Sequence, residues 1–225
     1  MKRTITLLSV LLYAAAACSA ALAAETPLDM PVAQPGAPKL TIQEIEEAVE
    51  NLNTYIGGYP PRLSSEQQRN QVYETWKRAL REARRQDKAR PGSEQVLHLL
   101  AELYRQGHNL DVRTSADLAV ETIDSCLARF PKSLGCNFSA SYFYLSVNPK
   151  YAPKGEQALL TLRGIFAPDV NIEVERGLVY AYVMQQRRAD ALKQIDYYLT
   201  LEPGADWALQ FKRGLEDGEI KLQEE

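Results

Sequence analysis

Apolar residues recur at every third or fourth position along most of the chain, with polar residues between them. This period matches the turn of an α-helix, so it predicts amphipathic helices rather than strands. The clearest example is residues 171–204, in which two such helices flank the polar segment Gln185–Arg188 and end at Pro203–Gly204. Proline cannot continue a helix, and glycine accepts the left-handed conformation beyond a helix end. A single pair of this size cannot bury both apolar faces, so we expect the chain to repeat it.

The same pattern predicts helices along the rest of the chain. Thr41–Glu44 and Ser64–Gln67 match capping boxes, which start helices to about Tyr55 and Lys88. Two further pairs are expected at residues 93–130 and 134–167, with enlarged polar joints at 108–114 and 148–153, and a last helix at 206–222. The expected organisation is a flexible proline-rich leader over residues 24–40, N-terminal helices over 41–92, three helix pairs over 93–204, and a capping helix with an acidic tail over 205–225.

Regular spacings run through these expected helices. An alanine precedes a proline by twelve residues four times, at Ala48 and Pro60, Ala79 and Pro91, Ala119 and Pro131, and Ala191 and Pro203. Four residues after each alanine stands Leu52, Ala83, Ile123 or Ile195. In the first helices of the pairs, Leu100-Ala101, Ala140-Ser141 and Leu178-Val179 precede Tyr104, Tyr144 and Tyr182 at one interval.

These spacings resemble the tetratricopeptide repeat, a 34-residue helix pair with leucine, glycine and tyrosine on its first helix and alanine and proline on its second. The resemblance implies an all-α fold of antiparallel helix pairs stacked in a right-handed superhelix. Residues 172–203 match best, whereas residues 41–60 match a second helix alone. The repeat's glycine is replaced by Ala101, Ser141 or Val179, and the long helix over residues 65–88 fits poorly.

In such a stack the first helices line a concave surface. The candidate groove residues on these helices are His98, Glu102, Arg105, Phe138, Tyr142, Leu145, Arg176, Tyr180 and Met184. Aromatic residues flanked by arginines would suit a peptide with apolar anchors and some acidic character. Packing of Phe138, Tyr142 and Tyr180 against neighbouring repeats is the alternative interpretation.

The first 23 residues are typical of a secretory signal peptide. A basic start at Lys2 and Arg3 precedes an apolar run, and Ala21-Leu22-Ala23 forms a small-x-small cleavage site. We therefore expect an exported, periplasmic protein of a bacterial envelope. Alternatively, Cys18 follows three alanines and is the lipidated first residue of an outer-membrane lipoprotein, which is the one case in which we expect membrane attachment.

Composition and charge narrow the possible partners. The chain is 45% hydrophobic and 24% charged, as expected for a folded domain. Lys2 and Arg3 are the only charged residues in segment 1–23, so its removal leaves 24 basic and 29 acidic residues and a net charge of −5. This balance argues against a nucleic-acid binder. The basic stretch Lys77–Arg90 is interpreted as a solvated helix face or as a docking patch for an acidic partner or anionic lipid.

Cys126 and Cys136 flank the turn at Pro131, one near the end of a predicted helix and one near the start of the next. Export permits a disulfide between them, and a pair of buried thiols is the alternative. With only two histidines in the chain, we expect no catalytic, metal or cofactor site, although His98 and Glu102 lie one turn apart. We discount Asn137-Phe138-Ser139 as a glycosylation site because it falls on a helix. The expected function is a non-enzymatic scaffold that binds a protein or peptide of the cell envelope, or alternatively a lipoprotein subunit of an envelope assembly or secretion complex.

Overall fold

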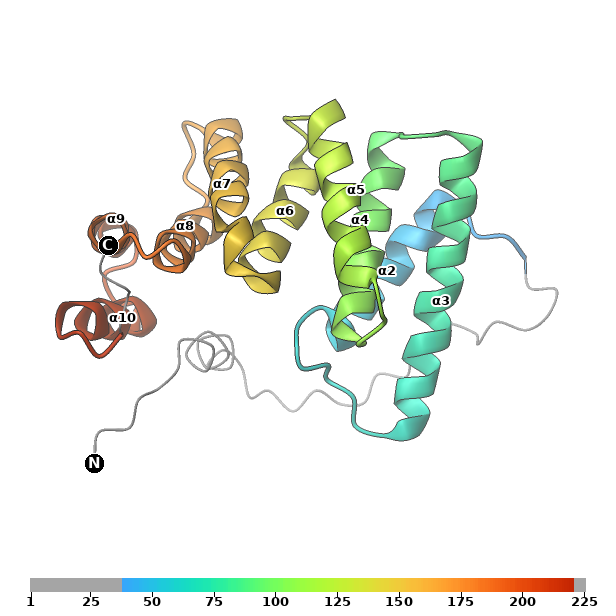
Figure 1. Cartoon of the computed structure of the whole chain (residues 1–225), viewed down its shortest axis with the longest axis horizontal. Coiled ribbons are helices and arrows are strands. Elements are labelled where there is room, and N and C mark those ends of the chain that lie inside the picture. The colour runs from blue at the N-terminus through green and yellow to red at the C-terminus, as the bar shows by residue number, and fades with distance from the viewer. Residues whose placement is uncertain (1–37, 221–225) are drawn as a thin grey trace. The chain divides into compact units, whose positions relative to one another are not determined.

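The computed structural model describes residues 38–220, and within this range the protein is all-α, as predicted. Nine α-helices and one 3-10 helix make up the secondary structure of these residues (Figure 1). They are α2 (Ile42–Ile56), α3 (Glu66–Ala89), α4 (Glu94–Asn109), α5 (Ser115–Arg129), α6 (Leu134–Val147), η1 (Pro149–Tyr151), α7 (Ala152–Phe166), α8 (Ile172–Met184), α9 (Arg188–Leu201) and α10 (Asp206–Glu216). The predicted signal peptide, most of the predicted leader and the last five residues lie outside the described range.

The chain divides into two compact units, with the boundary between Phe143 and Tyr144 inside α6. We call described residues 38–143 the N-terminal unit and described residues 144–220 the C-terminal unit. In both units, most helix contacts join elements that are neighbours in the sequence. This arrangement is consistent with a helical repeat.

Side-chain caps start the first two helices. The Thr41 hydroxyl accepts a hydrogen bond from the Glu44 N–H, and the Glu44 carboxylate accepts one from the Thr41 N–H, so the predicted capping box is confirmed. The second cap lies one residue later than predicted: Ser65 accepts from the Gln68 N–H, and the Gln68 side chain accepts from the Ser64 N–H. Gln68, rather than Gln67, therefore occupies the third helical position.

The residues of the repeated spacing lie in helix contacts. The four alanines and the residues four places after them are all 0% exposed: Ala48, Ala79, Ala119, Ala191, Leu52, Ala83, Ile123 and Ile195. Tyr104 and Tyr144 are also buried, and Tyr182 is half-buried beneath the Arg187 guanidinium, which lies 4.6 Å from its ring centre. The small alanine side chains let neighbouring helices approach closely. The repeated spacing in the sequence therefore marks the positions at which helices pack against each other.

In the N-terminal unit, α2 packs against both α3 and α4, α3 packs against α4, and α4 packs against α5 (Figure 1). Residues 42–56 therefore pair with α3 instead of forming a lone second helix. Trp76 of α3 anchors this packing, because its indole N–H donates to the Leu103 carbonyl at 2.7 Å. Gly107 makes room for the ring: a Cβ atom at that position would lie 2.6 Å from Trp76.

Cys126 and Cys136 form the predicted disulfide, with their Cα atoms 6.2 Å apart. Both cysteines are fully buried and pack with Leu97, Leu127 and Phe130. The bond ties the last turn of α5 to the first turn of α6 across the turn that contains Pro131.

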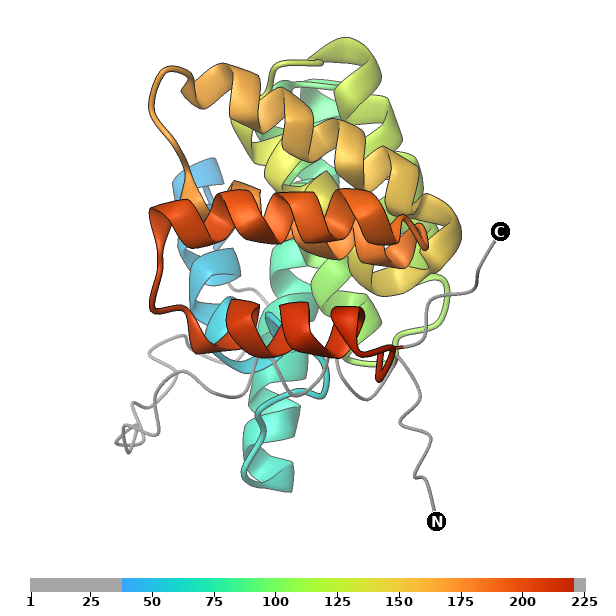
Figure 2. The same ribbon diagram turned by 90° about the vertical axis from the view of Figure 1, so that its left-hand side faces the viewer.

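In the C-terminal unit, α7 packs against α8, α8 against α9, and α9 against α10, the last two lying side by side in Figure 2. The predicted last helix is shorter than expected. It ends at Glu216 because Gly218, which follows the C-cap residue Asp217, adopts a left-handed conformation with φ of 70°. On this helix Leu209 is 39% exposed, whereas Ala208 is buried.

Candidate functional site

The nine residues predicted to line a groove are divided between the two units. His98, Glu102, Arg105, Phe138 and Tyr142 belong to the N-terminal unit, and Leu145, Arg176, Tyr180 and Met184 belong to the C-terminal unit. Their exposure differs widely: Tyr142 is 71% exposed, whereas Arg105 is 9% exposed. Their contacts therefore decide which of them are available to a partner.

Glu102 and Arg105 are bound within the N-terminal unit. One Arg105 nitrogen donates to Glu102 and to the Asn53 side chain, both at 2.7 Å, and another donates to the Gly57 carbonyl. The Ser139 hydroxyl donates to the second Glu102 oxygen at 2.6 Å. Burial alone would raise the pKa of Glu102, but the charge of Arg105 and the hydrogen bonds from Arg105 and Ser139 outweigh it and lower the pKa. This pair joins α2, α4 and α6 and does not offer its charges to a partner.

Two more polar side chains of α4 complete this connection. Gln106 donates to the Val49 carbonyl and Asn109 donates to the Ile56 carbonyl, each at 2.9 Å. Of these two carbonyls, only that of Ile56 belongs to the last turn of α2, which contains no basic residue that could bind it. Asn109 therefore caps the end of α2, whereas Gln106 joins α4 to the middle of α2, and both roles are structural.

His98 is half-buried between α4 and α6. A Cβ atom on Gly135 would lie 2.8 Å from the His98 ring, so the imidazole rests directly against the first turn of α6. Among residues 38–220, no three His, Cys, Asp or Glu side chains are grouped so that they could hold a metal ion. His98 and Glu102 therefore lack a third ligand in the described part of the chain.

α6 is unusual because its 14 residues include no charged side chain. Leu134, Phe138 and Tyr142 stand at four-residue intervals on one face, and they are 45%, 36% and 71% exposed. We call these three residues the α6 stripe. A helix that is uncharged on all sides is normally covered, so an exposed apolar face on it indicates an interaction surface.

Three of the four predicted groove residues of the C-terminal unit make contacts inside that unit. Arg176 forms an ion pair with Glu173 on its own helix. Tyr180 stacks on Trp207 of α10, with ring centres 5.8 Å apart, and meets the edge of Phe211 at 5.9 Å. Leu145 packs against the α7–α8 core, and Met184 is half-buried. These contacts match the alternative interpretation, in which aromatic residues pack against neighbouring helices.

The basic half of α3 is partly used by internal contacts. Arg78 donates to the Pro38 carbonyl and Arg85 to the Leu40 carbonyl, each at 3.1 Å. Arg84 donates to the Tyr104 hydroxyl at 3.1 Å and lies over its ring. Three of the basic side chains of this helix therefore hold neighbouring segments of the N-terminal unit in place.

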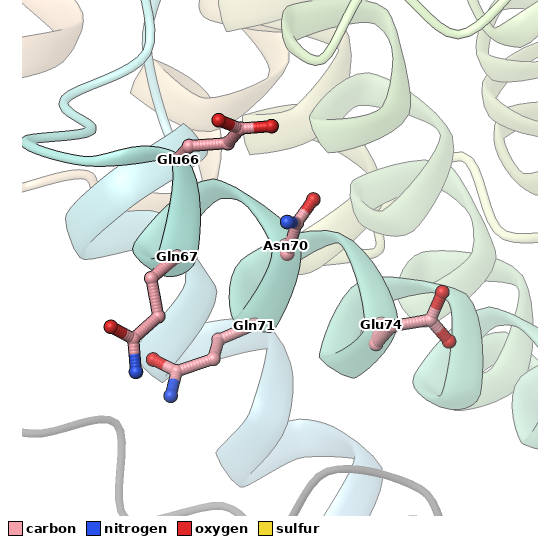
Figure 3. Close-up of a pocket in the computed structure, with 5 residues that line it drawn as sticks. All are labelled: Glu66, Gln67, Asn70, Gln71 and Glu74. Carbon is pink, nitrogen blue, oxygen red and sulfur yellow. The ribbon is translucent and has the colours of Figure 1, made fainter.

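A surface hollow lies along the first half of α3. The five side chains that line it all come from this one helix: Glu66, Gln67, Asn70, Gln71 and Glu74. Figure 3 shows that they leave α3 in different directions instead of converging on one point. A catalytic or ligand site needs convergent groups, so this hollow is not a candidate for one.

Asn137 has the sequence context of a glycosylation site but is 2% exposed. Its amide donates to the Pro131 carbonyl at 3.0 Å and to the Ser133 carbonyl at 2.7 Å. The side chain therefore fixes the α5–α6 turn and is closed to modification in the folded protein.

No family model, curated protein or solved structure matches this chain. Within residues 38–220, none of the helices is both long and apolar enough to cross a bilayer. The candidate site is therefore defined by geometry, and it is the α6 stripe. The sequence prediction included Phe138 and Tyr142 but missed Leu134, although the uncharged run from Leu134 to Val147 marks it.

Proposed function

We propose that the protein is a non-enzymatic scaffold that binds a protein or peptide partner in the cell envelope through the α6 stripe. The observation that carries the proposal is the exposure of three large apolar side chains on a helix without charged residues. Burying such a face against a partner is favourable, because it removes apolar surface from water and α6 has no charged side chain whose ion pair would be broken.

The packing of the spaced alanines supports the view that the helix pairs are tetratricopeptide-like repeats. The proposal therefore includes a right-handed superhelix whose first helices line the binding surface. Export is also part of it. The sequence pattern of residues 1–23 and the Cys126–Cys136 disulfide both favour an oxidising compartment such as the periplasm.

Site-specific photo-crosslinking in living cells tests this function. A photoreactive phenylalanine analogue replaces Tyr142 in one variant and Tyr59 in a matched control, because Tyr59 is also well exposed, at 59%, but lies outside the helices. We expect a discrete protein adduct at position 142 and none at position 59. The same adducts at both positions, or no adduct at position 142, would contradict the proposal.

A binding measurement with the isolated partner follows. Tyr142→Ala should weaken binding at least tenfold, because exposed aromatic anchors dominate small interfaces. Tyr59→Ala should leave the affinity within about twofold. Circular dichroism of both variants should match that of the parent, since both side chains are largely solvent-exposed.

The second candidate function is a lipoprotein subunit of an envelope assembly or secretion complex, attached through Cys18. The three alanines before this cysteine favour it, and residue 18 lies outside the described range. The mass of the mature N-terminus separates the two candidates.

A further inference from the structure

We infer that the partner of the α6 stripe is a polypeptide segment with apolar anchors and a net positive charge. The inference rests on the proposed function, because it specifies the chemistry of the partner for the same surface.

The three helices α2, α4 and α6 carry many carboxylates and a single cation. The acidic residues within their bounds are Glu44, Glu46, Glu47, Glu50, Glu94 and Glu102, and Arg105 is the one lysine or arginine. Arg105 is buried in its ion pair with Glu102, so it contributes no positive charge to the surface. Arg78 of α3 also acts on Glu44, so the uncompensated negative charge of these helices is that of Glu46, Glu47, Glu50 and Glu94.

The carboxylates of α2 remain available for a partner. Glu46 accepts a hydrogen bond from Gln95 at 2.6 Å, and Glu47 accepts one from Gln43 at 3.0 Å, but both donors are neutral amides. Glu50 is exposed. Among the described residues, none of Glu46, Glu47 and Glu50 forms an ion pair. A cationic partner would supply the missing counter-charges.

We call Glu46, Glu47 and Glu50 of α2 the acidic row. Contacts within the N-terminal unit join the acidic row to the α6 stripe through α4. Glu46 of α2 meets Gln95 of α4, and three residues later His98 meets Gly135 of α6. At 100° per residue, Tyr142 lies about 20° from the direction of Gly135, two turns further along α6. Tyr142 therefore points to the side of α6 that α4 borders, and the carboxylates of α2 lie across α4 from it.

This arrangement reverses the charge expected for the partner. Arg105 was expected to attract an acidic segment, but it is bound inside the unit, and the exposed charges of α2 are negative. A segment with aliphatic or aromatic residues one turn apart would cover the α6 stripe, and lysine or arginine beside them would reach toward Glu46 and Glu50. Opposite charges at the edge of an interface raise the association rate and orient the partner.

Two labelled synthetic peptides test the inference. Both form amphipathic helices with the same leucine and phenylalanine positions, but one carries lysine and the other glutamate on the polar side. Fluorescence anisotropy measures their binding to the full mature chain at low and high salt. The lysine peptide should bind at least tenfold more tightly than the glutamate peptide, and its affinity should fall as salt screens the carboxylates.

Matched variants locate the binding. Glu46→Gln with Glu50→Gln should weaken the lysine peptide roughly five- to tenfold, since each exposed charge pair contributes modestly. Asp117→Asn with Glu121→Gln removes the same net charge from α5 and should leave the affinity within about twofold. Tyr142→Ala should weaken binding at least tenfold.

Each contrary outcome identifies what is wrong. Equal binding of both peptides, lost in Tyr142→Ala, would overturn the charge inference and leave the scaffold function standing. No binding of the lysine peptide would overturn the inference. The scaffold function is tested separately, by crosslinking at position 142. A dimer of the chain that dissociates in Tyr142→Ala would assign the stripe to a second copy and would also overturn it.

Discussion

Glu102 and Arg105 depend on each other because both are withdrawn from water. Glu102→Gln removes the counter-charge and leaves a guanidinium that is largely buried. We expect the free energy of unfolding to fall by roughly 2–3 kcal/mol, somewhat less than for a fully buried pair because the amide oxygen still accepts hydrogen bonds. Urea denaturation followed by circular dichroism measures the change. Glu47→Gln, at an exposed position of α2, should stay within about 0.5 kcal/mol of the parent.

The same pair gives the stability a defined pH dependence. The pKa of Glu102 in the folded protein lies below its ordinary value of 4.5, so the unfolded state binds a proton more readily. The contribution of the Glu102 carboxylate to the free energy of unfolding is present above pH 4.5 and is lost as the pH falls through its pKa in the folded protein. The stability difference between parent and Glu102→Gln should therefore narrow in acid. A difference that stays constant from pH 7 into acid would contradict this.

For Tyr198 we expect a contribution to stability that is lost at alkaline pH instead of at acidic pH. Burial, followed by the hydrogen bond that its hydroxyl donates to Glu202, raises its pKa from 10.0 to about 12. An unfolded tyrosine releases its proton first, so stability is lost as the pH rises from about 10 through 12. Tyr198→Phe should lower stability by about 1 kcal/mol at neutral pH and reduce its alkaline loss. Burial also raises the pKa of Tyr182, so ultraviolet titration of tyrosinate should show one fewer late-titrating group in Tyr198→Phe than in the parent. An unchanged number of late-titrating groups would contradict the assignment to Tyr198.

The joint between α5 and α6 depends on a covalent bond as well as on packing. The disulfide closes a loop with a sequence separation of 10 residues, and its loss should cost about 2–3 kcal/mol. Cys126→Ala with Cys136→Ala should therefore lower the melting temperature, and a reducing agent should lower that of the parent alone. A parent that melts at the same temperature with and without the reducing agent would show that the bond does not stabilise the fold.

Helices and their close contacts could be predicted because both leave local periodic signals. The capping box at Thr41, the buried alanines and the proline stops each act within one or two turns of the chain. The burial of Arg105 could not be predicted in this way. Helical period places it on the exposed-looking side of α4, but Asn53 and Gly57, about fifty residues earlier, cover that side.

The candidate site was predictable to a similar extent. Phe138 and Tyr142 were identified from their spacing, and Leu134 follows from the absence of charge across α6. The acidic row on α2 was missed, because its proximity to α4 depends on tertiary contacts such as that between Glu46 and Gln95. In each case, the residues that share one face of a helix can be predicted from the local sequence. The segments that pack against that face depend on the tertiary fold.

Export of the chain would bring removal of residues 1–23 and formation of the Cys126–Cys136 disulfide, both of which change its mass, so one mass measurement tests them together. The proposed signal-peptide cleavage after Ala23 would give a chain beginning at Ala24, and oxidation of Cys126 and Cys136 makes it lighter by two hydrogens. We expect the protein purified from the envelope fraction to have this mass, and alkylation without reduction to leave it unchanged. A chain that begins at an acylated Cys18 would instead establish the lipoprotein. An uncleaved chain with all three cysteines, Cys18, Cys126 and Cys136, as free thiols would contradict export, since a buried disulfide forms and persists in an oxidising compartment.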